Sequence, residues 1–165
     1  MIIPFAFVDG NWTLSDSVLS GLWKKMETQR LHERTFKDGD VKTEDDFLKM
    51  MKSTHNIPVL CVDDEYSPAM IGWINGTGKK FGFGHFFVFR EFWGRSVEFG
   101  NQVLDYWFSL GGEDPVFETL VGLLRPENQV AVHYSERLGF RRLGEIPSVG
   151  VVMYKTRGEH GKGQL

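Results

Sequence analysis

One stretch of the sequence combines residue types that bind phosphate in many proteins. It reads "VFREFWGRSVEFG", residues 88–100, and its pattern predicts a strand, a short basic turn and the start of a helix. A helix N-terminus offers unpaired backbone N–H groups and a partial positive charge, so it binds phosphate where side chains stay away. Gly94 keeps the backbone accessible and Arg95 adds a cation, whereas Ser96 and Glu98 place side chains in the turn. The stretch predicts either a phosphate-binding turn or a helix start that satisfies its own amides.

Glu98 is the residue that separates these two interpretations. Two like charges about 4 Å apart repel by roughly 4 kcal/mol at an effective dielectric constant of about 20, and by about 1 kcal/mol in water. A carboxylate here therefore opposes phosphate binding. In the other interpretation Ser96 is the N-cap, and Glu98 in the first turn stabilises the helix dipole by about 0.3–1 kcal/mol. The sequence leaves both interpretations open.

Other kinds of chemistry leave no pattern in the chain. The five His are scattered, and none lies at the spacing of a His-Glu-x-x-His zinc site. The single cysteine, Cys61, cannot form an internal disulfide and lies in an apolar run, which predicts a core residue. No Gly-x-Ser-x-Gly motif of a serine nucleophile occurs. We expect no metal site.

The elements that would position the phosphate-binding turn follow from hydrophobic periodicity and turn residues. A strand ends at Asp9–Gly10, a helix capped by Ser15 or Ser17 follows, and Thr43 caps a second helix. The later elements are strands over 58–62, 69–75 and 80–89, a helix after the turn, a strand over 116–125, a helix over 128–138, and strands over 140–147 and 148–156. The turns between the middle strands are expected at 63–67 and 76–78, and the apolar end of 116–125 predicts a strand covered on both faces. This order predicts an α/β protein with a mixed sheet and helices on both faces.

The order β-α-α-β-β-β-α-β-α-β-β resembles that of the GNAT superfamily of acyl-CoA N-acyltransferases. Residues 88–98 are similar to the family's pyrophosphate loop, and Trp93–Gly94 is most similar to the branch that acetylates the N-termini of ribosomal proteins. A second family motif, Asn-x-x-Ala followed by Glu-Arg-Leu-Gly-Phe, matches Asn128, Ala131 and 136–140 in register. The resemblance covers nearly the whole chain, which predicts a single domain over residues 1–156 and a polar C-terminal tail over 157–165.

The resemblance implies an enzyme that transfers acetyl from acetyl-CoA to an amine by direct attack. It assigns the pantetheine arm of acetyl-CoA to the backbone of Phe86 to Val88 and to Asn128. It assigns the pyrophosphate to Trp93, Gly94, Arg95, Ser96 and Val97. Asn128 is equally well explained as the N-cap of its helix. Glu98 counts against this use of acetyl-CoA.

Four residues are candidates for proton transfer. A general base must take a proton from the attacking amine, and His85 and Glu118 lie on or beside the neighbouring strands. Gly82 and Gly84, beside His85 in "GFGHFFVF", predict a bulge or a close backbone approach. Family members commonly protonate the departing thiolate with a Tyr; that position is Ser135 here, and Tyr134 falls one residue earlier, about 100° away around the helix.

Bulk composition limits the partners. With a net charge of −3 the chain lacks the basic character of nucleic-acid-binding domains, and its apolar runs are too short for a membrane helix. The N-terminus lacks the features of a signal peptide, so we expect a cytoplasmic protein. The resemblance implies an amine-bearing small molecule or a protein N-terminus as acceptor, and the acidic segment "KDGDVKTEDD" suits a cationic amine or a solvated helix start.

A second function remains open on the same residues. A protein of this fold that has lost its cofactor would serve as a structural or assembly part, as in small GNAT-like proteins of bacteriophage heads or internal virion proteins. It would then have virion partners or form a homo-oligomer. The fourteen Phe and five Trp and the two altered loop positions favour this alternative, while the intact Asn128 motif favours the enzyme.

Overall fold

The computed structural model describes residues 1–36, 39 and 41–160. The chain forms two compact units, and each is described by itself. The first unit contains Met1–Trp73 and Phe86–Ser96, and the second contains Ile74–His85 and the chain from Val97 onward.

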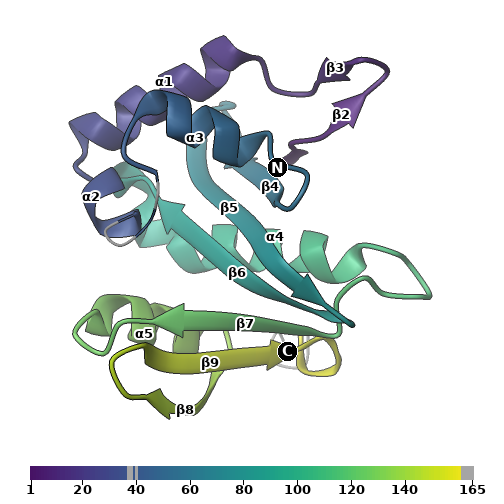
Figure 1. The fold of residues 1–165 in the computed structure, drawn as a ribbon, viewed down its shortest axis with the longest axis vertical. Helices are drawn as coiled ribbons and strands as arrows, with labels where there is room; N and C mark the ends of the chain where they lie inside the picture. Colours follow the sequence, from purple (N-terminus) through teal and green to yellow (C-terminus); the bar gives the residue numbers. More distant parts are fainter. Residues whose placement is uncertain (37–38, 40, 161–165) are drawn as a thin grey trace. The chain divides into compact units, whose positions relative to one another are not determined.

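The first unit begins with a short strand and a hairpin, followed by helices and the central strands. Its elements are β1 (Ile2–Pro4), β2 (Phe7–Val8), β3 (Asn11–Trp12), α1 (Asp16–Thr28), α2 (His32–Thr35), α3 (Glu44–Met51), β4 (Ile57–Val62), the first part of β5 (Pro68–Gly78), the end of β6 (Phe81–Val88) and the 3-10 helix η1 (Arg90–Arg95). β1 pairs antiparallel with β4, with Ile3 opposite Leu60. Figure 1 shows these elements in purple to teal.

Local signals in the sequence explain where the helices of the first unit begin. Ser15 caps α1 by accepting a hydrogen bond from the amide of Val18 at 3.4 Å. Thr43 and Asp46 form a reciprocal capping box at the start of α3. Both caps were predicted from the sequence. The inward faces of these helices then pack in one cluster with β4, β5 and β6, whose buried members include Leu19, Trp23, Met26, Phe47, Met51, Ile71 and Phe89.

Two predictions for the first part of the chain are wrong in detail. The strand expected to end at Asp9–Gly10 is β1 followed by the separate β2–β3 hairpin, because Asp9 and Gly10 both adopt positive φ (49° and 83°) and reverse the chain. The hairpin turn expected at 76–78 is also displaced, since β5 continues to Gly78 and the chain turns at 79–80, with Lys80 at φ 63°.

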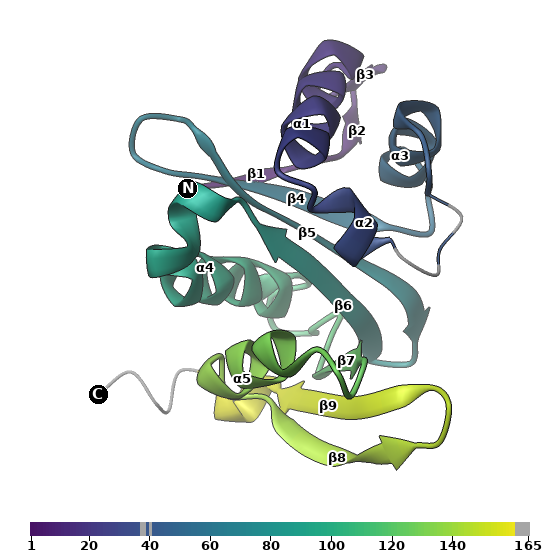
Figure 2. The ribbon, with the colours of Figure 1, turned by 90° about the vertical axis from the view of Figure 1, so that its left-hand side faces the viewer.

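The second unit contains the later strands and two helices. Its elements are the end of β5, the first part of β6, α4 (Ser96–Ser109), β7 (Thr119–Leu124), α5 (Gln129–Arg137), β8 (Arg141–Ile146), β9 (Gly150–Thr156) and the 3-10 helix η2 (Arg157–Glu159). β7 runs parallel to β6 and antiparallel to β9, and β8 forms the edge beside β9. Figures 1 and 2 show β7, β9 and β8 side by side with α5 against them.

Close packing in the second unit explains one of the strand glycines. A Cβ atom on Gly82 would collide with Ile74 Cγ2 and lie 3.0 Å from the Phe117 ring, so this position requires glycine. A Cβ atom on Gly84 would make only ordinary contact, 3.6 Å from Trp107. The predicted close backbone approach is therefore real at Gly82 and absent at Gly84.

Hydrogen-bonded neighbours give the strands of the described residues the order β1-β4-β5-β6-β7-β9-β8. The mixed sheet and the order of strands and helices are those predicted from the sequence, apart from the added hairpin and α2. The start of the expected tail is structured: Arg157 donates to the carbonyl of Gly112, and His160 bonds Asp105 of α4 at 2.6 Å. None of the helices in the described part of the chain is long and apolar enough to span a membrane.

Candidate functional site

The parallel pairing of β6 with β7 ends before either strand does. The register runs from Phe81 opposite Thr119 to Phe83 opposite Val121. β7 continues to Leu124, and on its other side the pairing with β9 extends to Leu124 opposite Val151. Within the described residues, β7 therefore has a paired edge and an edge whose ladder stops at Val121. Backbone groups along 122–124 suit an extended ligand that pairs like a strand.

Leu123 is more exposed than the sequence predicts. The apolar end of the strand was predicted to be covered on both faces, yet Leu123 is 43% exposed. That prediction is wrong at Leu123, because an apolar run does not reveal whether both faces of a strand are covered.

Asn128 lies just beyond β7 and begins α5. Its side-chain oxygen accepts a hydrogen bond from the amide of Ala131 at 3.2 Å, so it is the N-cap of this helix. The cap uses the oxygen and leaves the N–H groups of Nδ2 as the donors that Asn128 would offer a ligand.

The turn after β6 is helical. Phe89 has an extended backbone (φ −63°, ψ 143°), and the chain from Arg90 forms η1, which runs directly into α4. The amide of Phe92 donates to the carbonyl of Phe89 at 2.9 Å, and the amide of Ser96 donates to the carbonyl of Trp93. These amides are therefore used within the helix.

Ser96 is consequently not the N-cap expected in the second of the two interpretations. Its backbone is helical (φ −58°, ψ −37°), whereas an N-cap residue is extended. Val97 and Glu98 follow in the first turn of α4, and the Glu98 side chain is exposed. The helical segment begins at Arg90, and other residues satisfy its first amides.

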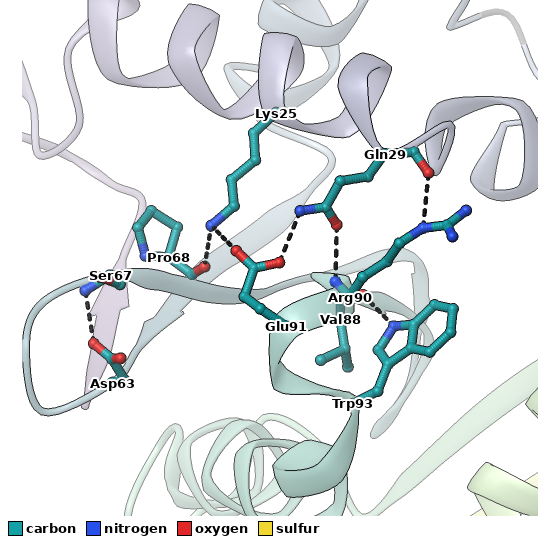
Figure 3. Close-up of polar contacts among 9 residues, drawn as sticks. All are labelled: Lys25, Gln29, Asp63, Ser67, Pro68, Val88, Arg90, Glu91 and Trp93. Carbon is teal, nitrogen blue, oxygen red and sulfur yellow. Dashed lines mark hydrogen bonds and ion pairs between the residues drawn. The ribbon is translucent and has the colours of Figure 1, made fainter.

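Gln29, at the C-terminal end of α1, supplies the first of these contacts. Its Oε1 accepts from the amide of Arg90 at 2.8 Å, and its Nε2 donates to Glu91 Oε2 at 2.7 Å. The backbone carbonyl of Gln29 also accepts from Arg90 Nε at 3.0 Å. Figure 3 shows this arrangement, which we name the Gln29–Glu91 clamp after its two central residues.

Lys25 holds the same carboxylate from one turn earlier on α1. Its Nζ lies 2.7 Å from Glu91 Oε1 and donates to the carbonyl of Pro68 at 3.0 Å (Figure 3). Burial acts to raise the pKa of Glu91, but hydrogen bonds from Lys25 and Gln29 outweigh it and hold the pKa below its usual range. Glu91 is therefore ionised at neutral pH.

Trp93 folds back on the end of β6. Its Nε1 donates to the carbonyl of Val88 at 3.0 Å, and the Arg90 guanidinium lies 5.4 Å from its ring centroid. The carbonyl of Val88, expected to bind a pantetheine arm, already has a partner in the chain (Figure 3). Phe86, expected to act with it, is half-buried.

Gly94 and Arg95 complete the turn. A Cβ atom on Gly94 would meet nothing within 4 Å, so packing does not require glycine there. Arg95 lies 3.9 Å from Asp64, and both side chains are largely exposed.

His85 lies on β6 beyond the paired register. Its Nε2 lies 2.9 Å from Asn75 Oδ1, at hydrogen-bond distance. Burial lowers the pKa of His85, so the imidazole is neutral at pH 7.

Glu118 lies at the other end of this pair of strands. It is exposed, its amide donates to the carbonyl of Lys80 at 2.7 Å, and it lines an open hollow with Thr156 and Arg157. Because Thr119 is opposite Phe81, Glu118 is level with Lys80, and His85 is roughly 16 Å further along the strand direction at about 3.3 Å per residue. The two predicted bases are not brought together.

Tyr134 and Ser135 both lie on α5, in partly or fully buried positions. Ser135 is 6% exposed. The Tyr134 hydroxyl lies against Gly100 of α4, where an added Cβ atom would fall 2.5 Å from it.

The described acidic residues of the predicted acceptor segment lie in the first turn of α3. Asp46 belongs to the capping box of α3, and its hydrogen bond to Thr43 lowers its pKa. Lys37, Asp38 and Asp40 of the same segment lie outside the described residues. Among the residues that are described, no group of three or more His, Cys, Asp or Glu is placed to hold a metal ion.

Sequence reasoning missed Gln29 and Lys25. They are more than sixty positions from Arg90 and Glu91 in the chain, as the separation of 61 between Arg90 and Gln29 illustrates. No motif or local spacing connects the two segments, so only the folded chain reveals the clamp.

Comparison with known proteins identifies the fold. No family model matches the sequence, and no curated protein matches it. Among solved structures, AAC(6')-Ib in complex with ribostamycin and coenzyme A matches with a TM-score of 0.74 at 15% identity, covering 92% of this chain and 95% of that one. Spermidine N-acetyltransferase from Vibrio cholerae in complex with CoA and spermine matches with a TM-score of 0.72 at 14% identity, covering 96% and 97%. The aminoglycoside acetyltransferase AAC(6')-Ib with coenzyme A and kanamycin gives 0.70 at 14%, covering 96% of both chains.

These likenesses confirm the α/β mixed sheet with GNAT topology. At such identities they establish the fold alone. The similarity of Trp93–Gly94 to the ribosomal-protein branch stays a prediction.

Proposed function

We propose that the chain is an N-acyltransferase that moves an acyl group from a pantetheine thioester, such as acetyl-CoA, to an amine. The observation that carries this proposal is the edge of β7, whose pairing with β6 ends at Val121 while the strand continues to Leu124. A pantetheine arm has two amide groups, which suit pairing with an extended backbone. Asn128 follows this edge and offers its Nδ2 donors.

The reaction needs few protein groups. The amine nitrogen bonds to the thioester carbonyl carbon, the C–S bond breaks, and one proton of the amine ends on the departing sulfur. We assign the proton-accepting role to His85, because it lies on β6 beyond the pairing with β7 and its imidazole is neutral. Glu118 is the weaker candidate, since it precedes β7 at the end opposite to 122–124. Tyr134 and Ser135 remain the candidates on α5 for returning the proton to sulfur.

The acceptor we propose is a small molecule with primary amino groups. Support comes from the fold neighbours, whose complexes contain ribostamycin, kanamycin and spermine. A protein N-terminus is the alternative acceptor.

A second candidate is a non-catalytic protein of this fold with a structural or assembly role. The contacts that favour it are those of Trp93 with the Val88 carbonyl and of Gln29 with the Arg90 amide. Both occupy groups that a CoA-binding turn would offer to its ligand.

Release of free thiol distinguishes the two candidates. The protein is mixed with acetyl-CoA or S-acetylpantetheine and with spermidine, kanamycin or a short peptide. The enzyme proposal predicts amine-dependent thiol release that falls at least tenfold in His85→Gln and less than twofold in the control Glu118→Gln. Absence of amine-dependent release with both donors and all acceptors contradicts it and favours the non-catalytic role.

A further inference from the structure

The described residues differ in how well they suit the two ends of an acyl-CoA molecule. This matters only if the chain uses a pantetheine thioester, so the inference below rests on the proposed function.

Backbone amides at the start of η1, just before the residues assigned to the pyrophosphate, and the amide of Ser96 among those residues are already bonded. The amide of Arg90 donates to Gln29 Oε1 at 2.8 Å. The amide of Phe92 donates to the Phe89 carbonyl at 2.9 Å, and that of Ser96 to the Trp93 carbonyl. A diphosphate would have to displace these internal acceptors before it gained any contact.

Charge at the same place also opposes an anion. Glu91 carries a negative charge beside the first amides, and Lys25 fixes its carboxylate at 2.7 Å. Glu98 adds an exposed carboxylate in the first turn of α4. The Arg90 guanidinium is directed to the Gln29 carbonyl at 3.0 Å and to the Trp93 ring.

The pantetheine end is different. Along 122–124, β7 continues beyond its pairing with β6, and its other edge is held by β9 up to Leu124. An extended arm with amide groups could pair with the backbone there, because β9 already holds the other edge of β7. It would not need to displace hydrogen bonds within η1.

We propose that this chain recognises its acyl donor through the pantetheine arm and does not select for the nucleotide diphosphate. The ligand class is S-acyl pantetheine thioesters, with the distal end free, phosphorylated or joined to the CoA nucleotide. The clamp of Gln29 and Glu91 is the element that removes diphosphate recognition.

Calorimetric titration of the full chain with three donors tests the proposal. The donors are acetyl-CoA, S-acetyl-4′-phosphopantetheine and S-acetylpantetheine, and ADP is added as a nucleotide diphosphate without an arm. We expect dissociation constants of the three donors within threefold of one another and no heat from ADP at millimolar concentration. Acetyl-CoA binding more than thirtyfold tighter than S-acetylpantetheine, or binding of ADP alone, overturns the inference and leaves the acyltransferase proposal standing. Failure of all three donors to bind overturns the proposed function itself.

Glu98→Gly distinguishes two causes of weak diphosphate binding, which are repulsion by the Glu98 carboxylate and backbone amides that are already hydrogen-bonded. If the amides are occupied, removing this carboxylate leaves the ratio of the acetyl-CoA and S-acetylpantetheine dissociation constants within threefold of the wild-type ratio. A selective gain in acetyl-CoA affinity above tenfold shows that the amides are accessible and contradicts the inference. Circular dichroism of the variant confirms that α4 is retained.

Discussion

The Tyr134 hydroxyl occupies the space that a side chain at Gly100 would need. A Cβ atom at Gly100 would lie 2.5 Å from Tyr134 Oη and 2.7 Å from Leu138 Cδ2. α4 and α5 therefore approach closely at this point because one residue lacks a side chain, and Tyr134 is a packing residue whatever else it does.

Gly100→Ala should destabilise the protein. Alanine gains about 1 kcal/mol in helix propensity, but overpacking costs about 1–3 kcal/mol, so we expect a net loss of stability. Adding Tyr134→Phe should recover part of the loss because it removes the hydroxyl. Chemical denaturation measures each free energy of unfolding.

Gly94→Ala, in the preceding 3-10 helix η1, is the matched control. Open space surrounds an added Cβ there, so this variant should be as stable as wild type or more stable by about 0.5–1 kcal/mol. Equal effects of the two substitutions would contradict the packing account.

Gly82 and Gly84 should respond differently to alanine. Gly82→Ala places a Cβ against Ile74 and Phe117, and we expect a loss of about 1–3 kcal/mol. Gly84→Ala makes ordinary contact with Trp107 and should cost less than about 1 kcal/mol. Thermal unfolding of both variants checks the order, and a greater loss at Gly84 would refute it.

His85 should make stability depend on pH. Burial holds its folded pKa below the ordinary value of 6.5, so the unfolded chain binds a proton first as the pH falls. The contribution of His85 is therefore constant above about pH 7 and becomes progressively destabilising below about pH 6.5. Urea unfolding of wild type and His85→Gln between pH 8 and 5 isolates it, because other groups cancel in the difference. A difference that does not vary with pH would rule out a buried neutral imidazole.

The Gln29–Glu91 clamp should be measurable as a coupling. In a double-mutant cycle of Gln29→Ala and Glu91→Gln, we expect a coupling energy of about 0.5–1.5 kcal/mol. Glu91 has a lowered pKa, so its contribution is complete above about pH 4.5 and is lost as the pH falls through the folded pKa.

A double-mutant cycle of Arg142→Ala and Glu145→Gln provides the control for the clamp. Glu145 pairs with Arg142 at 2.7 Å on exposed β8, and such surface pairs contribute about 0–1 kcal/mol. A clamp that couples no more strongly than this surface pair would contradict its assigned role.

Much of the fold followed from local sequence signals. Residues close together in the chain predicted the caps at Ser15 and Thr43, the helix that begins at Asn128 and the mixed sheet. The β2–β3 hairpin was missed because its strands are too short to show alternation, although Asp9–Gly10 marked its turn.

The candidate site was less predictable, because its decisive contacts join distant segments. The sequence identified the turn and the two altered positions, and one of its two interpretations was a helix start that satisfies its own amides. It assigned that role to Ser96, whereas Gln29 performs it at Arg90, the true start of the helical segment. The end of the β6–β7 pairing at Val121 likewise depends on tertiary structure.

Hydrogen exchange along β7 measures whether a pantetheine arm pairs with residues 122–124. Amide exchange at 122–124 is measured in the free protein and with saturating S-acetylpantetheine, and Leu120, buried and paired on both sides, serves as the internal reference. The account predicts at least tenfold slower exchange at one or more of residues 122–124 and no change at Leu120. Unchanged exchange at 122–124 under saturating ligand would contradict it.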